Sequence, residues 1–289
     1  MAKVSAERAD QMTLRRRDRI RLWRDTGLPD GLELLTASCF DHSYPAHFHD
    51  EFVVAAFSRG SQRNRILRHD GIAAAGTVMI IHPGEVHTAE AATREEGWDY
   101  CAFYPSARLL DRIASDVLGG HGLLDFGSEA MHHDPKVTQD LLRAHRIITG
   151  SPDRLERECA AYAAFGGIIA RYGRWSHSGG RRTAARADIR RSMDYLQAHF
   201  ADAISIANVA AVAGLSEYHF MHVFRTCTGL TVHRYLTQIR LNRAKDLLSR
   251  GTDAAETALS VGLYDQSHLI RQFRKYYGVT PGTYAAACR

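Results

Sequence analysis

The chain has 289 residues, of which 45% are hydrophobic and 24% are charged. This composition is that of an ordinary globular protein and excludes collagen-like, low-complexity and wholly disordered chains. The length favours two domains. No apolar run reaches about 18 residues, so we expect no transmembrane helix and no membrane partner, and the polar N-terminus is not typical of a secretory signal. The five cysteines form no CxxC pair, which indicates neither a disulfide framework nor a cysteine zinc site and favours the cytoplasm.

The charge is distributed unevenly along the chain. Residues 26–172 carry a net charge of −7, whereas residues 186–289 carry +5. An acidic body joined to a basic C-terminal quarter is typical of a protein in which one domain avoids polyanions and another binds them. Residues 1–25 carry a net +4 with few apolar side chains, so we expect a flexible basic arm.

Three regions follow the arm. Short apolar runs between Leu32 and Tyr104 are separated by turn signals, which predicts a small β-sandwich or barrel. From Pro135 the apolar residues recur at helical spacing, which predicts two amphipathic helices that pack on the barrel or on a partner subunit. Residues 173–185 are rich in glycine, serine and arginine and are expected to be a linker. The remaining chain is predicted to be almost entirely helical.

The C-terminal quarter contains an internal repeat. Two segments, at about residues 204–229 and 253–278, are each predicted to form a helix, a tight turn and a second helix, with the turn at Gly214 or Gly262. Ser216 and Asp265 are suited to cap the second helix of each unit. Residues 232–248 are predicted to form a rigid connector helix. Two covalently joined helix-turn-helix units could reach two successive major grooves of DNA within one chain.

Residues 186–289 resemble the DNA-binding domain of the AraC/XylS family of transcriptional regulators. The resemblance is carried by the run from Asp265 to Pro281, with Tyr284 following. It implies a seven-helix domain with one recognition helix in each of two adjacent grooves, a homodimer, and contact with RNA polymerase if the protein is an activator. The predicted contacts with double-stranded promoter DNA are Ser216, Glu217, Tyr218, Met221, His222, Arg225, Gln266, Ser267, Ile270, Arg271 and Arg274. Met221 and His222 depart from the long polar pair often found in the family.

A histidine-rich motif lies in the predicted barrel. His47, His49 and Glu51 alternate, so a strand would place them on one face. The later run from Gly76 to His87 adds a further histidine. The two segments resemble the sequence motifs of the cupin fold, which is seen in the effector-binding domain of many AraC-type regulators. The resemblance implies a cupin-like effector-binding and dimerisation domain over residues 26–172.

Three interpretations of this motif compete. Two imidazoles at i and i+2 with a third from a neighbouring strand suit a transition metal, so His47, His49 and His87 are a possible metal site. However, the acidic residue that cupin enzymes place four or five positions after the second histidine is replaced here by Val53 or Val54. The groups could instead be purely structural polar residues at a barrel mouth. We favour a pocket that orients a small-molecule effector. Its candidate residues are His47, His49, Glu51, His87, Trp98 and Tyr100.

These features predict a mixed fold, with an N-terminal cupin-like β-barrel and packed helices, then an all-α domain with two helix-turn-helix units. The predicted function is that of a sequence-specific DNA-binding transcriptional regulator whose activity is modulated by a small-molecule effector. We expect no enzymatic activity and no cofactor, since the chain has no GxSxG, P-loop or GxGxxG motif. The alternative is a metal-dependent cupin enzyme or metal sensor fused to a DNA-binding domain.

Overall fold

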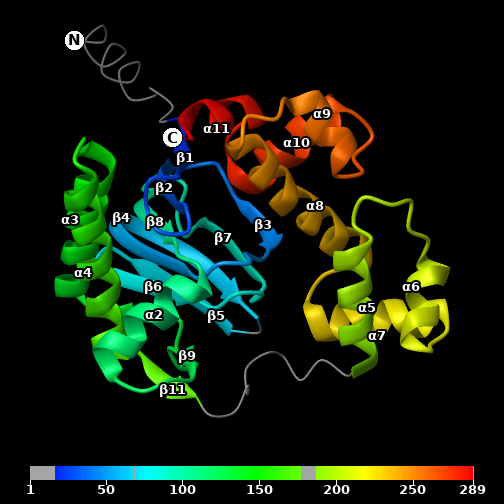
Figure 1. Ribbon diagram of the computed structural model, residues 1–289, viewed down its shortest axis with the longest axis horizontal. Coiled ribbons are helices and arrows are strands. Elements are labelled where there is room, and N and C mark those ends of the chain that lie inside the picture. The colour runs from blue at the N-terminus through cyan, green and yellow to red at the C-terminus, as the bar shows by residue number, and fades with distance from the viewer. Residues whose placement is uncertain (1–16, 68, 177–186, 289) are drawn as a thin grey trace, which may run out of the picture.

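The computed structural model describes residues 17–67, 69–176 and 187–288. They form a β-rich N-terminal half and a helical C-terminal half, which confirms the predicted mixed fold (Figure 1). The strands are β1 (Arg19–Asp25), β2 (Leu32–Cys39), β3 (Tyr44–His47), β4 (Val53–Ile66), β5 (His69–Ala74), β6 (Thr77–Ile81), β7 (His87–Ala91), β8 (Trp98–Tyr104), β9 (Leu123–Asp125), β10 (Met131–His133) and β11 (Arg174–Ser176). The helices are α2 (Ala107–Leu118), α3 (Pro135–Gly150), α4 (Arg154–Tyr172), α5 (Ala187–Ala198), α6 (Ile206–Ala213), α7 (Glu217–Thr228), α8 (Val232–Ser249), α9 (Ala254–Ser260), α10 (Gln266–Tyr277) and α11 (Pro281–Ala287).

The long strand β4 joins the two sides of the barrel. Its first part pairs with β6 and β8, and its second part pairs with β5 and β7. Gly60 lies just past the irregularity in the β4–β8 register and has a φ of +65°. A Cβ atom there would lie 1.9 Å from the carbonyl oxygen of Gly97. Glycine is therefore required at the position where β4 passes from one side of the barrel to the other.

The strands have two apolar faces because side chains alternate along each strand. In β8, Cys101 and Phe103 pack with α2, α3 and α4, which cover one face of the sheet (Figure 1). Tyr100 and Tyr104 point to the other face, inside the barrel. That inner face shares its hydrophobic cluster with side chains of α8, α10 and α11. The second half of the helical domain is thus packed against the interior of the barrel.

The helical half contains the two predicted helix-turn-helix units, α6–α7 and α9–α10, joined by α8. Gly214 and Gly262 have φ values of +71° and +74°, the left-handed conformation that ends a helix and favours glycine. Asp265 caps α10, since its carboxylate accepts a hydrogen bond from the His268 N–H at 2.6 Å. Ser216 occupies the N-cap position of α7 in an extended conformation, as predicted, although its side chain makes no capping hydrogen bond.

Three boundaries differ from the sequence predictions. Residues Arg19–Asp25, assigned to the basic arm, form β1 and pair with β2. Residues 174–176, assigned to the linker, form β11 and pair with β9. Strand β3 ends at His47, so His49 and Glu51 lie in the following loop and not on one strand face. Residues 1–16 of the predicted arm and 177–186 of the linker lie outside the described residues. Within the described ranges, none of the helices has the length and hydropathy needed to cross a membrane.

Candidate functional site

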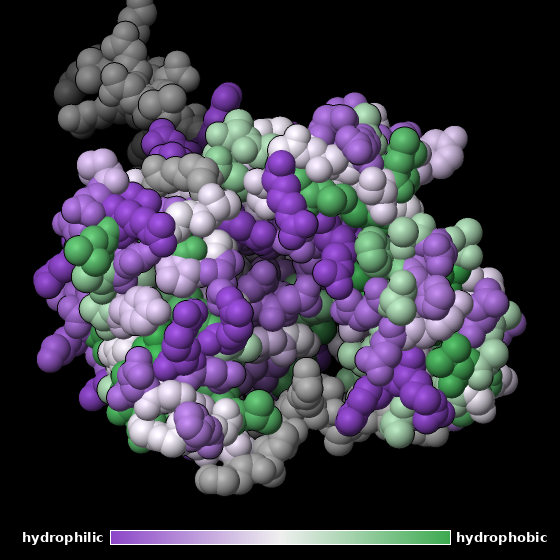
Figure 2. Space-filling view, viewed as in Figure 1, coloured by the Kyte–Doolittle hydropathy of each residue, from purple (hydrophilic) through white to green (hydrophobic). Residues whose placement is uncertain are grey.

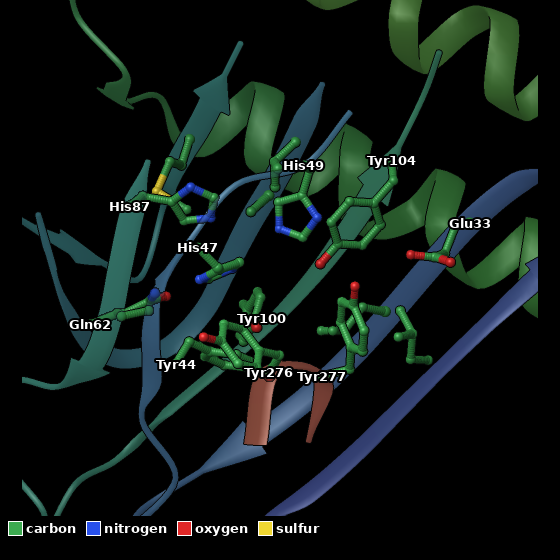
Figure 3. Close-up of a pocket in the computed structure, with 16 residues that line it drawn as sticks. Glu33, Tyr44, His47, His49, Gln62, His87, Tyr100, Tyr104, Tyr276 and Tyr277 are labelled. Atoms are coloured by element: carbon green, nitrogen blue, oxygen red, sulfur yellow. The ribbon is translucent and has the colours of Figure 1, made fainter. Parts of the chain in front are cut away.

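A small cavity lies inside the barrel, directly under α10. Its volume is about 30 Å³. That is room for about two water molecules, whereas pockets for drug-sized ligands occupy about 300–1,000 Å³. The polar side chains that line it come from both halves of the protein (Figure 3). They are Glu33, Tyr44, His47, His49, Gln62, His87, Tyr100, Tyr104, Tyr276 and Tyr277.

Three buried histidines are brought together on one wall of this cavity. His47 of β3 lies directly opposite His87 of β7 in the strand register, and their ring centroids are 4.2 Å apart. The ring of His49, from the loop after β3, lies 5.0 Å from His47 and 5.3 Å from His87. One ring nitrogen from each residue lies within 4.8 Å of the others. The structure therefore assembles the histidines that the sequence placed in two separate motifs.

Backbone carbonyls fix the protonation of two of these rings. Nδ1 of His47 lies 2.7 Å from the carbonyl oxygen of Pro45, and Nδ1 of His87 lies 3.0 Å from that of Glu85. A carbonyl oxygen can only accept a hydrogen bond, so each Nδ1 carries the proton and each neutral ring has its lone pair on Nε2. Nδ1 of His49 is buried and has no hydrogen-bond partner. Such an unsatisfied buried atom is unusual in a folded protein.

Burial keeps all three imidazoles neutral. Desolvation lowers the pKa of His47 and His49 well below the usual histidine value, and neighbouring histidines and Lys245 lower it further. Desolvation also lowers the pKa of His87, although its contacts with Glu85 act in the opposite direction. At neutral pH the cluster therefore presents lone pairs and N–H groups, and no positive charge.

Five tyrosines also line the cavity, together with apolar side chains of the barrel. Tyr44, Tyr100 and Tyr104 come from the barrel, whereas Tyr276 and Tyr277 come from the end of α10. Burial raises the pKa of Tyr100, Tyr104 and Tyr277 well above the usual tyrosine value, so their hydroxyls are neutral. The α10 tyrosines were not predicted to line a ligand site, because they lie in the DNA-binding half.

Buried polar contacts tie α8 and α11 to the barrel beside the cavity. Nζ of Lys245 donates to Oε1 of Glu33 at 2.6 Å, and each side chain is only 3% exposed. The Tyr284 hydroxyl donates to the other carboxylate oxygen of Glu33 at 2.8 Å. Burial alone would lower the pKa of Lys245, but Glu33 and Glu51 outweigh it and the net pKa is raised. Lys245 is therefore charged and paired within the interface between the two halves.

Two predicted pocket residues are not brought into the cavity. Trp98 is fully buried in the core, with its ring stacked on Tyr100 at 6.5 Å. Glu51 lies outside this cavity and lines a separate pocket that also contains Glu33 and Tyr104. The remaining predicted residues, His47, His49, His87 and Tyr100, line the cavity directly.

The predicted DNA contacts lie on two helix faces that point away from the protein core. On α7, Tyr218 is 83% and Met221 is 47% exposed. On α10, Arg271 and Arg274 are exposed, while Leu269 and Phe273 on the opposite side are fully buried. The exposed set also includes Ser216, Glu217, His222, Arg225, Gln266 and Ser267, and Ile270 is half-buried. In the view of Figure 2 much of the surface is hydrophilic, with small hydrophobic patches on both halves.

Comparison with known proteins gives the same two-part division. Residues 31–165 match the AraC-like ligand binding domain, and residues 209–287 match a helix-turn-helix domain. An uncharacterized HTH-type transcriptional regulator of Bacillus subtilis (strain 168), YbfI, is 23% identical over 226 residues, which are 78% of this chain and 81% of that protein. The arabinose operon regulatory protein of Escherichia coli (strain K12) is 33% identical over 102 residues, 35% of each chain.

Solved structures share the fold. The apo form of a ToxT variant from Vibrio cholerae strain SCE256 superimposes with a TM-score of 0.56 and 10% identity, and the match covers 93% of this chain and 97% of that one. Wild-type ToxT with a bound unsaturated fatty acid gives a TM-score of 0.54 and 12% identity, and covers 93% of this chain and 95% of that one. The arrangement of a β-rich half followed by a helical half is therefore common to both proteins.

Proposed function

Because this chain belongs to the AraC family of transcriptional regulators, we propose that a ligand in the barrel cavity controls how α7 and α10 engage promoter DNA. One observation carries the proposal. The helix that closes the cavity with Tyr276 and Tyr277 is the same helix that exposes Arg271 and Arg274. Any change at the cavity that moves α10 moves a candidate DNA-reading surface with it.

The two recognition helices are suited to one continuous DNA site. The connector α8 has 18 residues and is therefore about 27 Å long. Successive major grooves on one side of DNA are about 34 Å apart, so a rigid connector of this length suits two neighbouring grooves. Tyr218, Met221 and His222 would read bases from α7, and Gln266, Ser267 and Arg271 from α10. Arg225 and Arg274 are suited to phosphate contacts.

Effector control requires two arrangements with different affinity for the ligand. In the arrangement described here, the cavity of about 30 Å³ is closed by α10 and has no room for a drug-sized molecule. An organic effector would therefore enter only if α10 moved outward or the barrel wall rearranged. The fatty acid bound to the structurally similar ToxT indicates that an amphipathic acid is a reasonable first probe.

Self-association is proposed to use α3 and α4. These antiparallel helices cover the outer face of the sheet (Figure 1). A groove of about 550 Å³ runs along them. The groove has small apolar residues such as Ala160 and Ala163, flanked by charges of both signs such as Asp140 and Arg143. A surface that carries both signs can be self-complementary, as a twofold dimer requires. RNA polymerase would be a further partner if the protein activates transcription, and the absence of enzymatic activity stays a prediction.

Selection from random-sequence DNA with the full chain, followed by footprinting, tests the proposal. We expect one protected site per chain with two contact regions about one helical turn apart. Substitution of Met221 or His222 should relax sequence preference in one region, and substitution of Gln266 or Arg271 should relax it in the other. Equal binding to all sequences, or a single contact region that responds to both sets of variants, would contradict the proposal.

A further inference from the structure

We propose that His47, His49 and His87 bind one divalent transition-metal ion of the kind that prefers imidazole ligands, such as Zn²⁺, inside the barrel. This inference goes beyond the regulatory proposal, because the ion would be held by the barrel whether or not DNA is bound. Among the described residues, these three form the group of histidine, cysteine and acidic side chains close enough to share an ion. All three are buried.

The geometry needs little adjustment to hold an ion. Metal–nitrogen bonds of about 2.0–2.1 Å in a tetrahedral site place the ligand nitrogens about 3.3 Å apart. The nitrogens here lie within 4.8 Å of one another, so small rotations of the rings bring them into range. The cavity volume of about 30 Å³ fits an ion with one water molecule and does not fit a larger organic ligand.

The hydrogen bonds around the cluster prepare it for metal binding. His47 and His87 each donate Nδ1–H to a backbone carbonyl, that of Pro45 and that of Glu85. This outer contact is the usual one for a metal-bound imidazole, because it fixes the ring and leaves Nε2 as the ligand atom. His49 has a buried ring nitrogen, Nδ1, without a partner. Unlike His47 and His87, the buried His49 ring is not oriented by a hydrogen bond from Nδ1, and coordination of an ion would hold it in place.

The donor set decides the class of ion. Three neutral nitrogens suit Zn²⁺, Cu²⁺, Ni²⁺, Co²⁺ or Fe²⁺, whereas Mg²⁺ and Ca²⁺ require oxygen ligands. The nearby cation Lys245 would oppose a metal ion, but its charge is paired with Glu33 at 2.6 Å. A fourth position would face the tyrosines that line the cavity, where Tyr104 lies 4.9 Å from the His49 ring. Water or an oxygen of an effector could occupy that position.

Co²⁺ titration of the full-length, chelator-treated protein tests the site. We expect visible absorption that saturates at one equivalent per chain and is displaced by Zn²⁺. His47→Asn and His87→Asn are the informative variants, because the asparagine amide can still donate to Pro45 or Glu85 while the Nε2 ligand is lost. Each variant removes one of the three ligand atoms, so each should weaken Co²⁺ binding by more than the roughly 10-fold that the loss of an outer-shell partner costs. His145→Asn, which removes a buried histidine outside the cluster, should bind Co²⁺ as the unaltered protein does.

Several results would overturn the proposal. They are the absence of saturation at one equivalent, binding that survives in both asparagine variants, and equal weakening in His145→Asn. Should the variants fail to fold by circular dichroism, electron paramagnetic resonance of the unaltered protein with one equivalent of Cu²⁺ decides the matter. Nitrogen couplings from several imidazoles would support the site, and a signal with oxygen ligands only would exclude it. None of these measurements uses DNA, so failure here leaves the regulatory proposal standing.

Discussion

The buried ion pair between Glu33 of β2 and Lys245 of α8 is expected to hold the DNA-binding half on the barrel. Replacing Glu33 with glutamine keeps the shape of the side chain but removes its charge. The Lys245 ammonium, only 3% exposed, would then lose the carboxylate that it contacts at 2.6 Å and would lie among buried tyrosines. Losing one partner of a buried pair costs about 3–5 kcal/mol. Glu51 lies near enough to raise the pKa of Lys245, so the lower end of that range applies.

This cost can be avoided if α8 separates from the barrel and Lys245 reaches water. A penalty of about 3 kcal/mol corresponds to a shift of about 100-fold in the equilibrium between packed and separated halves. Glu33→Gln is therefore expected to increase hydrogen exchange in α8 and α10 and to change operator affinity. The double variant Glu33→Gln with Lys245→Met should recover the packed state, because a well-packed apolar replacement of a buried ion pair is often neutral or stabilising.

Hydrogen exchange and operator binding of the single and double variants are the assays. Glu158→Gln is the matched control, because it removes one partner of the exposed Arg154–Glu158 pair on α4, where the Arg154 side chain is 70% exposed. An exposed pair contributes at most about 1 kcal/mol, so this variant should behave as the unaltered protein. The reasoning is refuted if Glu33→Gln and Glu158→Gln have the same effect, or if the double variant is no closer to the unaltered protein than Glu33→Gln.

Three further predictions follow from other parts of the structure. Arg271→Ala should weaken binding to the specific DNA site by about 1–3 kcal/mol and binding to random DNA much less. If titrations show an equal loss on the specific site and on random DNA, Arg271 contacts only phosphate. Burial lowers the pKa of His145 to about 4, so between pH 6.5 and pH 4 this imidazole is protonated in the unfolded chain but neutral in the folded chain. The neutral His145 therefore stabilises the folded state above pH 6.5, and about 3 kcal/mol of this stability is lost as the pH falls towards 4. In urea unfolding, His145→Phe should lose less stability between pH 6.5 and pH 4 than the unaltered protein does. Gly60→Ala should lower the free energy of unfolding by more than the roughly 1–3 kcal/mol of backbone strain, because the new Cβ would clash with the Gly97 carbonyl. Gly84 has a φ of +78° but open space around it, so Gly84→Ala should show the cost of strain only. Equal losses of stability in the two variants would exclude the clash.

Local patterns were enough to predict the helix-turn-helix units. Each unit depends on apolar spacing within a helix and on a glycine at its turn, and both are encoded within about 25 residues of sequence. Arg19–Asp25 was predicted wrongly, because its arginines are typical of a solvated arm. The apolar residues Ile20 and Leu22 alternate there, as in a strand. The segment is a strand because it pairs with β2, and the local charge composition does not show this pairing.

Contacts between distant segments account for what the sequence could not predict. His47 and His87 were recognised from their motifs, yet the loop position of Glu51 depends on where β3 ends. Tyr276 and Tyr277 were read only as part of the DNA-binding signature. Their place in the cavity wall depends on the packing of α10 against strands more than 170 residues earlier in the chain, which no local periodicity encodes.

The two sides of α10 set a quantitative limit on regulation. Tyr276 and Tyr277 are buried against the barrel, while Arg271 is exposed on the same 12-residue helix. A rigid helix cannot leave the cavity without moving its exposed face, so ligand binding and DNA binding share one conformational equilibrium. To convert a population that is 99% packed into one that is 99% separated, a ligand must bind the separated state about 10⁴-fold more tightly. A molecule too large for the closed cavity of about 30 Å³ meets this condition by exclusion from the packed state, whereas an ion that fits both states equally well would shift nothing.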